Sequence, residues 1–218
     1  MELTIVRHGE PQRGLEGTDR ADPWLSDRGH EQAIRAGRYL QEEAPYQALY
    51  CSPLLRARQT ADHIGEALGL TPVVDEGLSE FDRHAPEYLH FEDMKAAGDP
   101  RYHAFLRGDL SAWGTDAATF RAEAVGAMDR IIERHRGQRV GVVSHGGVAN
   151  VFLGTIIGLD RLAFHAPEYT GISRVIAGGP GKRGLVSINE TAHLRGLPAA
   201  AHTVRTASTH GDKAPTSA

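Results

Sequence analysis

The sequence of 218 residues contains little cysteine, few aromatic residues and no long apolar run. Its single cysteine, Cys51, cannot form an internal disulfide, so folding does not require an oxidising compartment. No apolar stretch approaches the roughly 20 residues that a membrane-spanning helix needs, and the first residues do not follow the signal-peptide pattern. We therefore expect a cytoplasmic protein without a membrane partner.

The sequence also lacks an excess of positively charged residues. The chain has 24 Lys and Arg against 28 Asp and Glu, which gives a net charge of −4 and an isoelectric point near 6.3. Nucleic-acid-binding proteins carry a strongly basic surface, so we expect no nucleic-acid partner. An acidic chain that binds an anion must do so in a local positive pocket.

Short apolar runs alternate with helical patterns along most of the chain. Strands are expected at 3–6, 48–51, 72–74, 139–143, 171–176 and 185–188, and helices at about 28–43, 53–68, 116–135 and after Gly147. This alternation predicts a three-layer α/β fold, in which a mostly parallel sheet carries helices on both faces.

Two segments depart from the alternating pattern. Residues 81–115 contain several aromatic side chains and a Gly-Asp-Pro break, and they are expected to form a small helical cap inserted over a site. Residues 198–218 are rich in Ala, Thr and Ser and predict a disordered tail. The main domain is therefore expected to span 1–197.

Three expected strands end in side chains suited to phosphate chemistry. Arg7-His8-Gly9 ends the first strand, Cys51-Ser52 leads to Arg56, and Ser144-His145-Gly146-Gly147 ends the fourth. Ligands of α/β sheets bind beyond the carboxyl ends of the strands, so these segments are expected to meet in one crevice. Arginine forks and helix N-termini bind phosphate, and a neutral imidazole is a competent nucleophile.

These segments resemble the histidine phosphatase superfamily, also called the phosphoglycerate mutase-like family. Its Arg-His-Gly motif is matched at 7–9, its Ser-x-Leu-x-Arg-Ala-x-x-Thr block at 52–60 and its Ser-His-Gly-Gly block at 144–147. Weaker matches at 25–33 and 189–194 extend the resemblance to about residues 1–195. Three blocks in the same order, each at a strand end, are far more specific than any one of them.

The resemblance implies a role for each matched residue. His8 would be the nucleophile, and His145 would stabilise the charge that spreads over the phosphoryl oxygens. Arg7, Arg56 and Gly146 would complete the phosphate-binding pocket. No metal ion or cofactor is implied.

The proton donor is predicted at Glu80, which follows the third expected strand. The resemblance is weaker here because the glycine that usually follows the acid is not obvious, and Asp82 is close enough to compete. A carboxyl group in a crowded, partly buried site can have its pKa raised far enough to carry a proton near neutral pH.

The combined prediction is a metal-independent phosphomonoesterase that hydrolyses a small phosphorylated metabolite through a phosphohistidine. One alternative is a phosphotransferase of the phosphoglycerate mutase type, and another is a non-catalytic protein that binds a phosphorylated ligand. A cysteine phosphatase is disfavoured, because five residues separate its nucleophile from its arginine, whereas four separate Cys51 from Arg56. The sequence predicts neither the substrate nor the oligomeric state.

Overall fold

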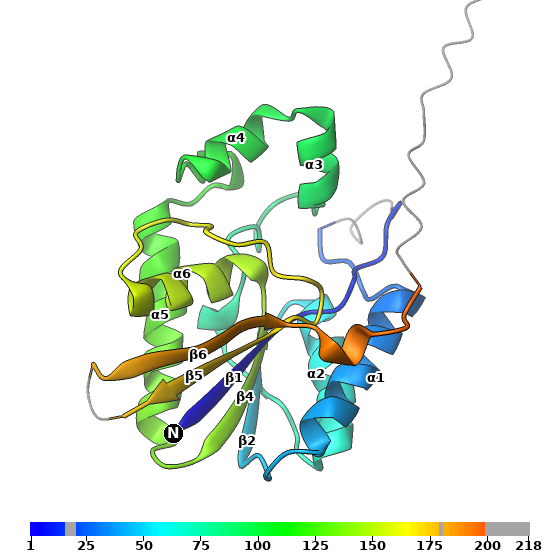
Figure 1. Ribbon diagram of the computed structural model, residues 1–218. Coiled ribbons are helices and arrows are strands. Elements are labelled where there is room, and N and C mark those ends of the chain that lie inside the picture. Colours follow the sequence, from blue (N-terminus) through cyan, green and yellow to red (C-terminus); the bar gives the residue numbers. More distant parts are fainter. Residues whose placement is uncertain (16–20, 179–180, 199–218) are drawn as a thin grey trace, which may run out of the picture.

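The structure is a computed structural model that describes residues 1–15, 21–178 and 181–198. Six strands form one sheet in the order β3-β2-β4-β1-β5-β6 (Figure 1). β1, β2, β3 and β4 are mutually parallel, whereas β5 and β6 run antiparallel to their neighbours. The strands are β1 (Glu2–Arg7), β2 (Ala48–Cys51), β3 (Val73–Val74), β4 (Arg139–Ser144), β5 (Ile172–Ala177) and β6 (Arg183–Glu190). The predicted mostly parallel sheet is confirmed.

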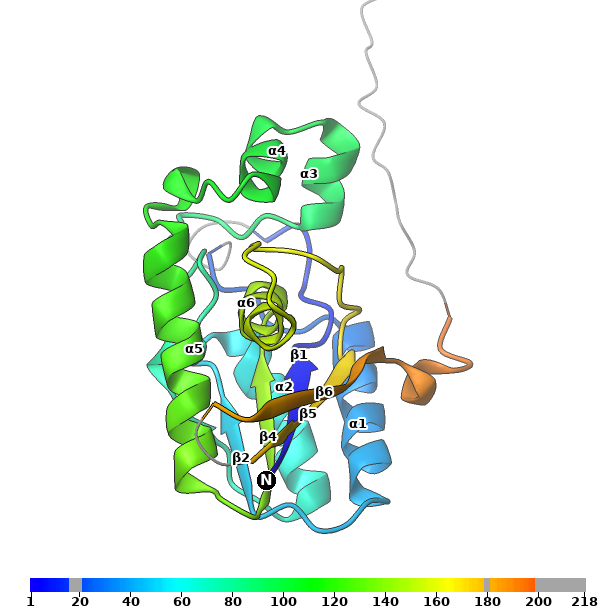
Figure 2. The ribbon, with the colours of Figure 1, turned by 60° about the vertical axis from the view of Figure 1, so that its left-hand side comes forward.

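Helices cover both faces of this sheet, which confirms the predicted three layers (Figures 1 and 2). Along β1 the side chains alternate between the faces, as the pleat of a strand requires. Leu3 and Ile5 enter the core beneath α5 and α6, whereas Val6 packs with α1 and α2. The helices are α1 (Asp27–Gln41), α2 (Leu55–Leu68), α3 (Phe91–Ala97), α4 (Pro100–Leu106), α5 (Ala117–Arg134) and α6 (Gly146–Ile157).

Local capping explains where two of the long helices begin. Ser26 precedes α1, and its hydroxyl accepts a hydrogen bond from the backbone N–H of Gly29. Asp116 precedes α5 and accepts from the N–H groups of Ala118 and Thr119. Each side chain satisfies donors that the first helical turn leaves without partners.

The start of α2 was predicted two residues too early. Pro53 was placed in its first turn, but the helix begins at Leu55. The N–H of Leu54 donates to Ser52 Oγ, and the N–H of Leu55 donates to the carboxylate of Asp22. These bonds replace those of the predicted first turn, and Asp22 comes from a loop that the local sequence of α2 does not reveal.

The cap lies beyond the carboxyl ends of the parallel strands (Figure 2). It contains α3 and α4, and its aromatic rings gather around Phe81, which contacts Phe91, Phe105, Trp113 and Phe120. Edge-to-face and offset ring contacts of this kind stabilise a cluster beyond simple burial. The cap thus has its own apolar anchor on the main core.

Residues 199–218 of the predicted tail lie outside the described residues, so the disorder of that tail stays a prediction. Among the helices in the described ranges, none has the length and apolar content needed to cross a membrane.

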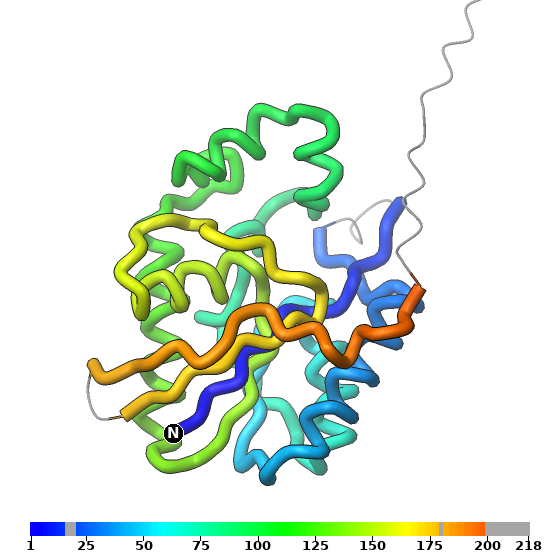
Figure 3. Tube along the Cα trace, viewed as in Figure 1, coloured from blue at the N-terminus to red at the C-terminus, as the bar shows by residue number. Residues whose placement is uncertain are grey.

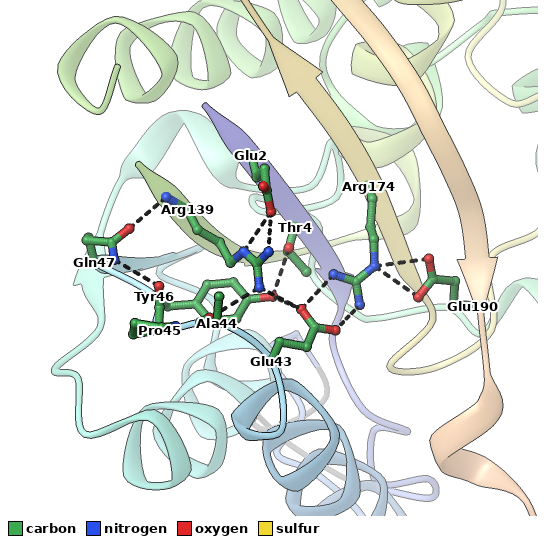
Figure 4. Close-up of polar contacts among 10 residues, drawn as sticks. All are labelled: Glu2, Thr4, Glu43, Ala44, Pro45, Tyr46, Gln47, Arg139, Arg174 and Glu190. Carbon is green, nitrogen blue, oxygen red and sulfur yellow. Dashed lines mark hydrogen bonds and ion pairs between the residues drawn. The ribbon is translucent and has the colours of Figure 1, made fainter. Parts of the chain in front are cut away.

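A charged network ties α1 to the sheet at the end opposite the cap (Figure 4). Glu43 follows α1 and accepts hydrogen bonds from Arg174 on β5, Arg139 on β4 and the Tyr46 hydroxyl. Arg174 also donates to Glu190 on β6 through its Nε, at 3.0 Å. The Glu43 carboxylate thus connects β4 and β5 to the segment that follows α1.

We expect Glu43→Ala to lower the free energy of unfolding by about 1.5–3 kcal/mol, the usual contribution of hydrogen bonds to a charged group. The matched control is Glu31→Ala, which breaks an exposed pair with Arg35 one helical turn away. That change should cost less than about 1 kcal/mol. Urea unfolding of both variants measures the difference, and equal losses would contradict a special role for the Glu43 network.

Candidate active site

The three predicted segments meet at one edge of the sheet. β1 pairs with β4 so that Arg7 lies beside Ser144, and the backbone N–H of His8 donates to the carbonyl oxygen of Ser144 at 2.8 Å. The rings of His8 and His145 are 5.1 Å apart, and Ser52 Oγ lies 2.7 Å from His145 Nε2. The register between two adjacent parallel strands therefore brings the two histidines together.

His8 is held as a neutral imidazole with a defined tautomer. Its Nδ1 lies 2.8 Å from the carbonyl oxygen of Gly9, which can only accept, so the proton is on Nδ1 and Nε2 keeps its lone pair. Burial lowers the pKa of His8 well below its usual range, and the guanidinium groups of Arg56 and Arg7 lower it further. Nε2 is consequently available as a nucleophile over the whole neutral range.

Arg7 and Arg56 supply two guanidinium groups to the same site. Arg7 Nη1 donates to the carbonyl oxygen of Pro167 at 2.6 Å, and Arg56 Nη2 pairs with Asp82 at 3.2 Å. In both arginines the Nε is buried and has no hydrogen-bond partner within the described ranges. Buried N–H donors without partners are rare, and here they offer binding positions for an oxyanion.

His145 contributes a third unpartnered nitrogen. Burial and the neighbouring Arg56 lower its pKa well below the usual range, so this imidazole is neutral as well. If the Ser52 hydroxyl donates to Nε2, the proton of His145 is on Nδ1, which is buried and unpartnered in the described structure. Gly146 directly follows as the first residue of α6 and adds a helix N-terminus to this corner of the site.

Glu80 reaches the site from the loop before the cap and is anchored on α6. Its Oε2 accepts a hydrogen bond from the N–H of Gly147 at 2.8 Å. Burial and the nearby carboxylate of Asp82 raise the pKa of Glu80 to about 7. A carboxyl group with this pKa can donate a proton and take one back near neutral pH.

The geometry separates Glu80 from its competitor Asp82. Asp82 accepts from Arg56 Nη2 in an ion pair whose side chains are 10 % and 1 % exposed. Burial raises the pKa of Asp82, but the adjacent guanidinium opposes that shift. Asp82 is thus engaged in orienting Arg56, whereas within the described residues Glu80 accepts hydrogen bonds from the backbone N–H groups of Gly147 and Phe81. This arrangement favours Glu80 as the proton donor.

Three residues at the site were missed by the sequence analysis. Asp22 contacts Arg56 Nη1 at 3.5 Å as well as capping α2. The ring of Tyr169 lies under the guanidinium of Arg7, 4.0 Å from its Cζ, and the ring of Tyr88 lies 4.4 Å from Cζ of Arg56. All three come from loops outside the matched blocks, and nothing in their local sequence marks them.

The sequence is similar to those of known proteins. A family model described as the histidine phosphatase superfamily (branch 1) matches residues 3–191. Phosphoglycerate mutase-like protein 4 of Arabidopsis thaliana is 31 % identical over 156 residues, which cover 67 % of this chain and 67 % of that protein. A metal-independent phosphoserine phosphatase of the same plant is 27 % identical over 154 residues, covering 67 % and 65 %.

Solved structures extend the likeness to the fold. A mutant phosphoserine phosphatase from Entamoeba histolytica in complex with phosphoserine superposes with a TM-score of 0.70. It is 24 % identical, and the match covers 88 % of this chain and 98 % of that one. At this identity the similarity describes the architecture of the sheet and its helices.

The site requires a glycine at position 147, and we expect a larger residue there to lower the stability of the protein. A Cβ at this position would lie 2.2 Å from Glu80 Oε1, so Gly147→Ala should displace the carboxylate and destabilise the protein. The matched control is Gly126→Ala inside α5, where the new Cβ meets only Arg130 Nη1 at 3.5 Å. That change should stabilise the helix by up to about 1 kcal/mol. Thermal unfolding that moves both variants in the same direction would contradict this.

Proposed function

We propose, because the chain belongs to the histidine phosphatase superfamily (branch 1), that it is a phosphomonoesterase acting through a phosphohistidine at His8. The observation that carries the proposal is a neutral, buried His8 whose Nδ1 is bonded to Gly9, so that Nε2 keeps its lone pair. Arg7, Arg56 and His145 lie nearby, and each has a buried nitrogen without a partner in the described residues. The Nε atoms of Arg7 and Arg56 and Nδ1 of His145 receive the phosphoryl oxygens. The substrate is a small phosphorylated metabolite.

In the first step, His8 Nε2 attacks phosphorus in line with the departing alkoxide. A P–N bond forms and the P–O bond to the alcohol breaks, while the Glu80 carboxyl group gives its proton to the leaving oxygen. The hydrogen bond from Nδ1 to Gly9 stabilises the positive charge that develops on the imidazole ring. The two arginines stabilise the charge on the equatorial oxygens.

In the second step, water replaces the alcohol. The Glu80 carboxylate takes a proton from the water, whose oxygen attacks phosphorus as the P–N bond breaks and its electron pair returns to Nε2. Inorganic phosphate leaves, and Glu80 is again protonated. A group with a pKa of about 7 is suited to both directions of proton transfer.

This chemistry takes its positive charge from side chains of the protein itself. We therefore propose that activity needs no metal ion or cofactor. In the part of the chain that the structure describes, no group of three or more His, Cys, Asp or Glu side chains is arranged to hold a metal ion.

A phosphotransferase of the mutase type is the second candidate. Such an enzyme must keep its phosphohistidine away from water, and the side chain of His8 is only 2 % exposed. The name of the first Arabidopsis relative points the same way. Incubation with 3-phosphoglycerate separates the candidates, because a phosphatase releases inorganic phosphate and a mutase moves the phosphoryl group to the neighbouring oxygen.

The nucleophile is tested by trapping the intermediate. Quenching during turnover should give one phosphoryl group on His8, stable in alkali and labile in acid, and His8→Ala should abolish both label and turnover. His84→Ala, which changes an exposed histidine of the cap, should retain both. All assays are run with and without a chelator. Near-normal turnover by His8→Ala would overturn the mechanism, and loss of wild-type activity in chelator would overturn metal independence.

The proton donor is tested with two leaving groups and a pH profile. Glu80→Gln should slow hydrolysis of an alkyl phosphate by about 10²- to 10⁴-fold, because an alkoxide needs a proton. Hydrolysis of p-nitrophenyl phosphate should slow far less, because nitrophenolate leaves without one. For the alkyl ester, wild-type kcat/KM should fall as pH rises through about 7, where Glu80 loses its proton. Glu80→Gln should remove this limb.

Asp82→Asn is the companion variant for this experiment. Because the Asp82 carboxylate raises the pKa of Glu80, its removal should move the alkaline limb to lower pH. Asp22→Asn, which changes the other carboxylate on Arg56, should leave that limb in place. A leaving-group-selective loss in Asp82→Asn, with none in Glu80→Gln, would assign the proton to Asp82 instead.

A further inference from the structure

The hydroxyl oxygen of Tyr169 is buried at the active site and takes no part in the mechanism proposed above. Its side chain is 8 % exposed, and its hydroxyl oxygen is buried with no hydrogen-bond partner in the described parts of the chain. We propose that this hydroxyl donates a hydrogen bond to the alcohol part of the substrate. The site would then select phosphate esters that carry a hydroxyl or carboxylate oxygen near the ester bond. The inference rests on the proposed phosphatase function.

The position of Tyr169 is fixed by bonds to the catalytic strand. The N–H of Thr170 donates to the carbonyl oxygens of both Arg7 and His8, at 3.1 and 3.2 Å. In return, the N–H of Arg7 donates to the carbonyl oxygen of Gly171, and Arg7 Nη1 donates to that of Pro167. The loop of Tyr169 is therefore attached to β1 on both sides of the tyrosine.

The ring of Tyr169 packs against two groups of the phosphoryl-transfer site. Its centroid lies 4.0 Å from Arg7 Cζ and 5.7 Å from the centroid of His8. A guanidinium over an aromatic face is an attractive contact, and it is stronger when both partners are desolvated. The ring alone accounts for the packing at this position, so a phenylalanine would serve equally well if the hydroxyl had no function.

The burial of the Tyr169 hydroxyl lowers the stability of the folded protein. A buried hydroxyl that gives up its bonds to water without gaining a partner destabilises a folded protein, and such groups are uncommon. Burial and the nearby Tyr88 raise the pKa of Tyr169 well above its usual range, so the group is a neutral O–H donor. A bound acceptor would satisfy it.

The surroundings of the hydroxyl indicate which part of a substrate it meets. Besides Arg7, the groups close enough to perturb its pKa are Tyr88 and Glu92 of the cap and Arg13 of the loop after β1. Phosphorus must bind between His8 and the three unpartnered donors, whereas these groups belong to the cap and an adjoining loop. We therefore assign the Tyr169 hydroxyl to the alcohol part of the substrate and not to its phosphoryl group.

The test compares glycerol 3-phosphate with n-propyl phosphate, which lacks the two free hydroxyls. We expect the wild type to prefer glycerol 3-phosphate by about tenfold in kcat/KM, the usual magnitude for one neutral hydrogen bond. Tyr169→Phe keeps the ring over Arg7 and should reduce this preference to near unity. The matched control is Tyr102→Phe, which removes a hydroxyl from a tyrosine on α4 of the cap and should keep the preference.

Further measurements distinguish a failure of this inference from a failure of the proposed phosphatase function. Inhibition by inorganic phosphate should be the same in Tyr169→Phe and the wild type, because the phosphate pocket is intact. The inference alone would be overturned by an unchanged preference in Tyr169→Phe or by an equal loss in Tyr102→Phe. It would also be overturned if the wild type hydrolysed p-nitrophenyl phosphate but did not prefer glycerol 3-phosphate. No hydrolysis of any of the three esters would overturn the function and the inference together.

Discussion

Burial, together with the two guanidinium groups of Arg7 and Arg56, keeps the histidines of the site neutral. With these charges close by and water excluded, both histidines of the site are neutral. A neutral His8 can attack phosphorus without first losing a proton, and a neutral His145 can still donate through an N–H. The proposed nucleophile thus depends on a site that is poorly solvated and holds two permanent cations.

Burying two cations requires compensation, which the fold supplies in several forms. Arg56 lies against Asp82 and Asp22, while Arg7 donates to a backbone carbonyl and rests on the ring of Tyr169. Desolvation of an unpaired ion costs several kcal/mol, so these contacts keep the cations buried and orient them. Within the described residues these contacts leave the Nε of each arginine without a partner, so this nitrogen remains available to a ligand.

The sequence predicted the parts of the site that belong to strand ends. His8, His145 and Arg56 lie in short blocks whose positions follow from alternating strands and helices, and the register of β1 with β4 brings two of them together. Asp22 and Tyr169 could not be found in this way, because long-range hydrogen bonds fix their loops against α2 and β1. The start of α2 was misplaced for the same reason.

The attachment of Glu80 to the N-terminus of α6 has a consequence for how such a protein can diversify. The carboxyl group is fixed by the sheet side of the molecule, and the aromatic cluster that anchors the cap begins one residue later, at Phe81. Beyond Tyr88, the cap can be lengthened, shortened or replaced without removing the hydrogen bond from Gly147 to Glu80 or the contacts that Asp82 and Tyr88 make with Arg56. The proposed reaction and its selectivity for substrates would then belong to different segments of the chain, so that the second could change while the first is kept.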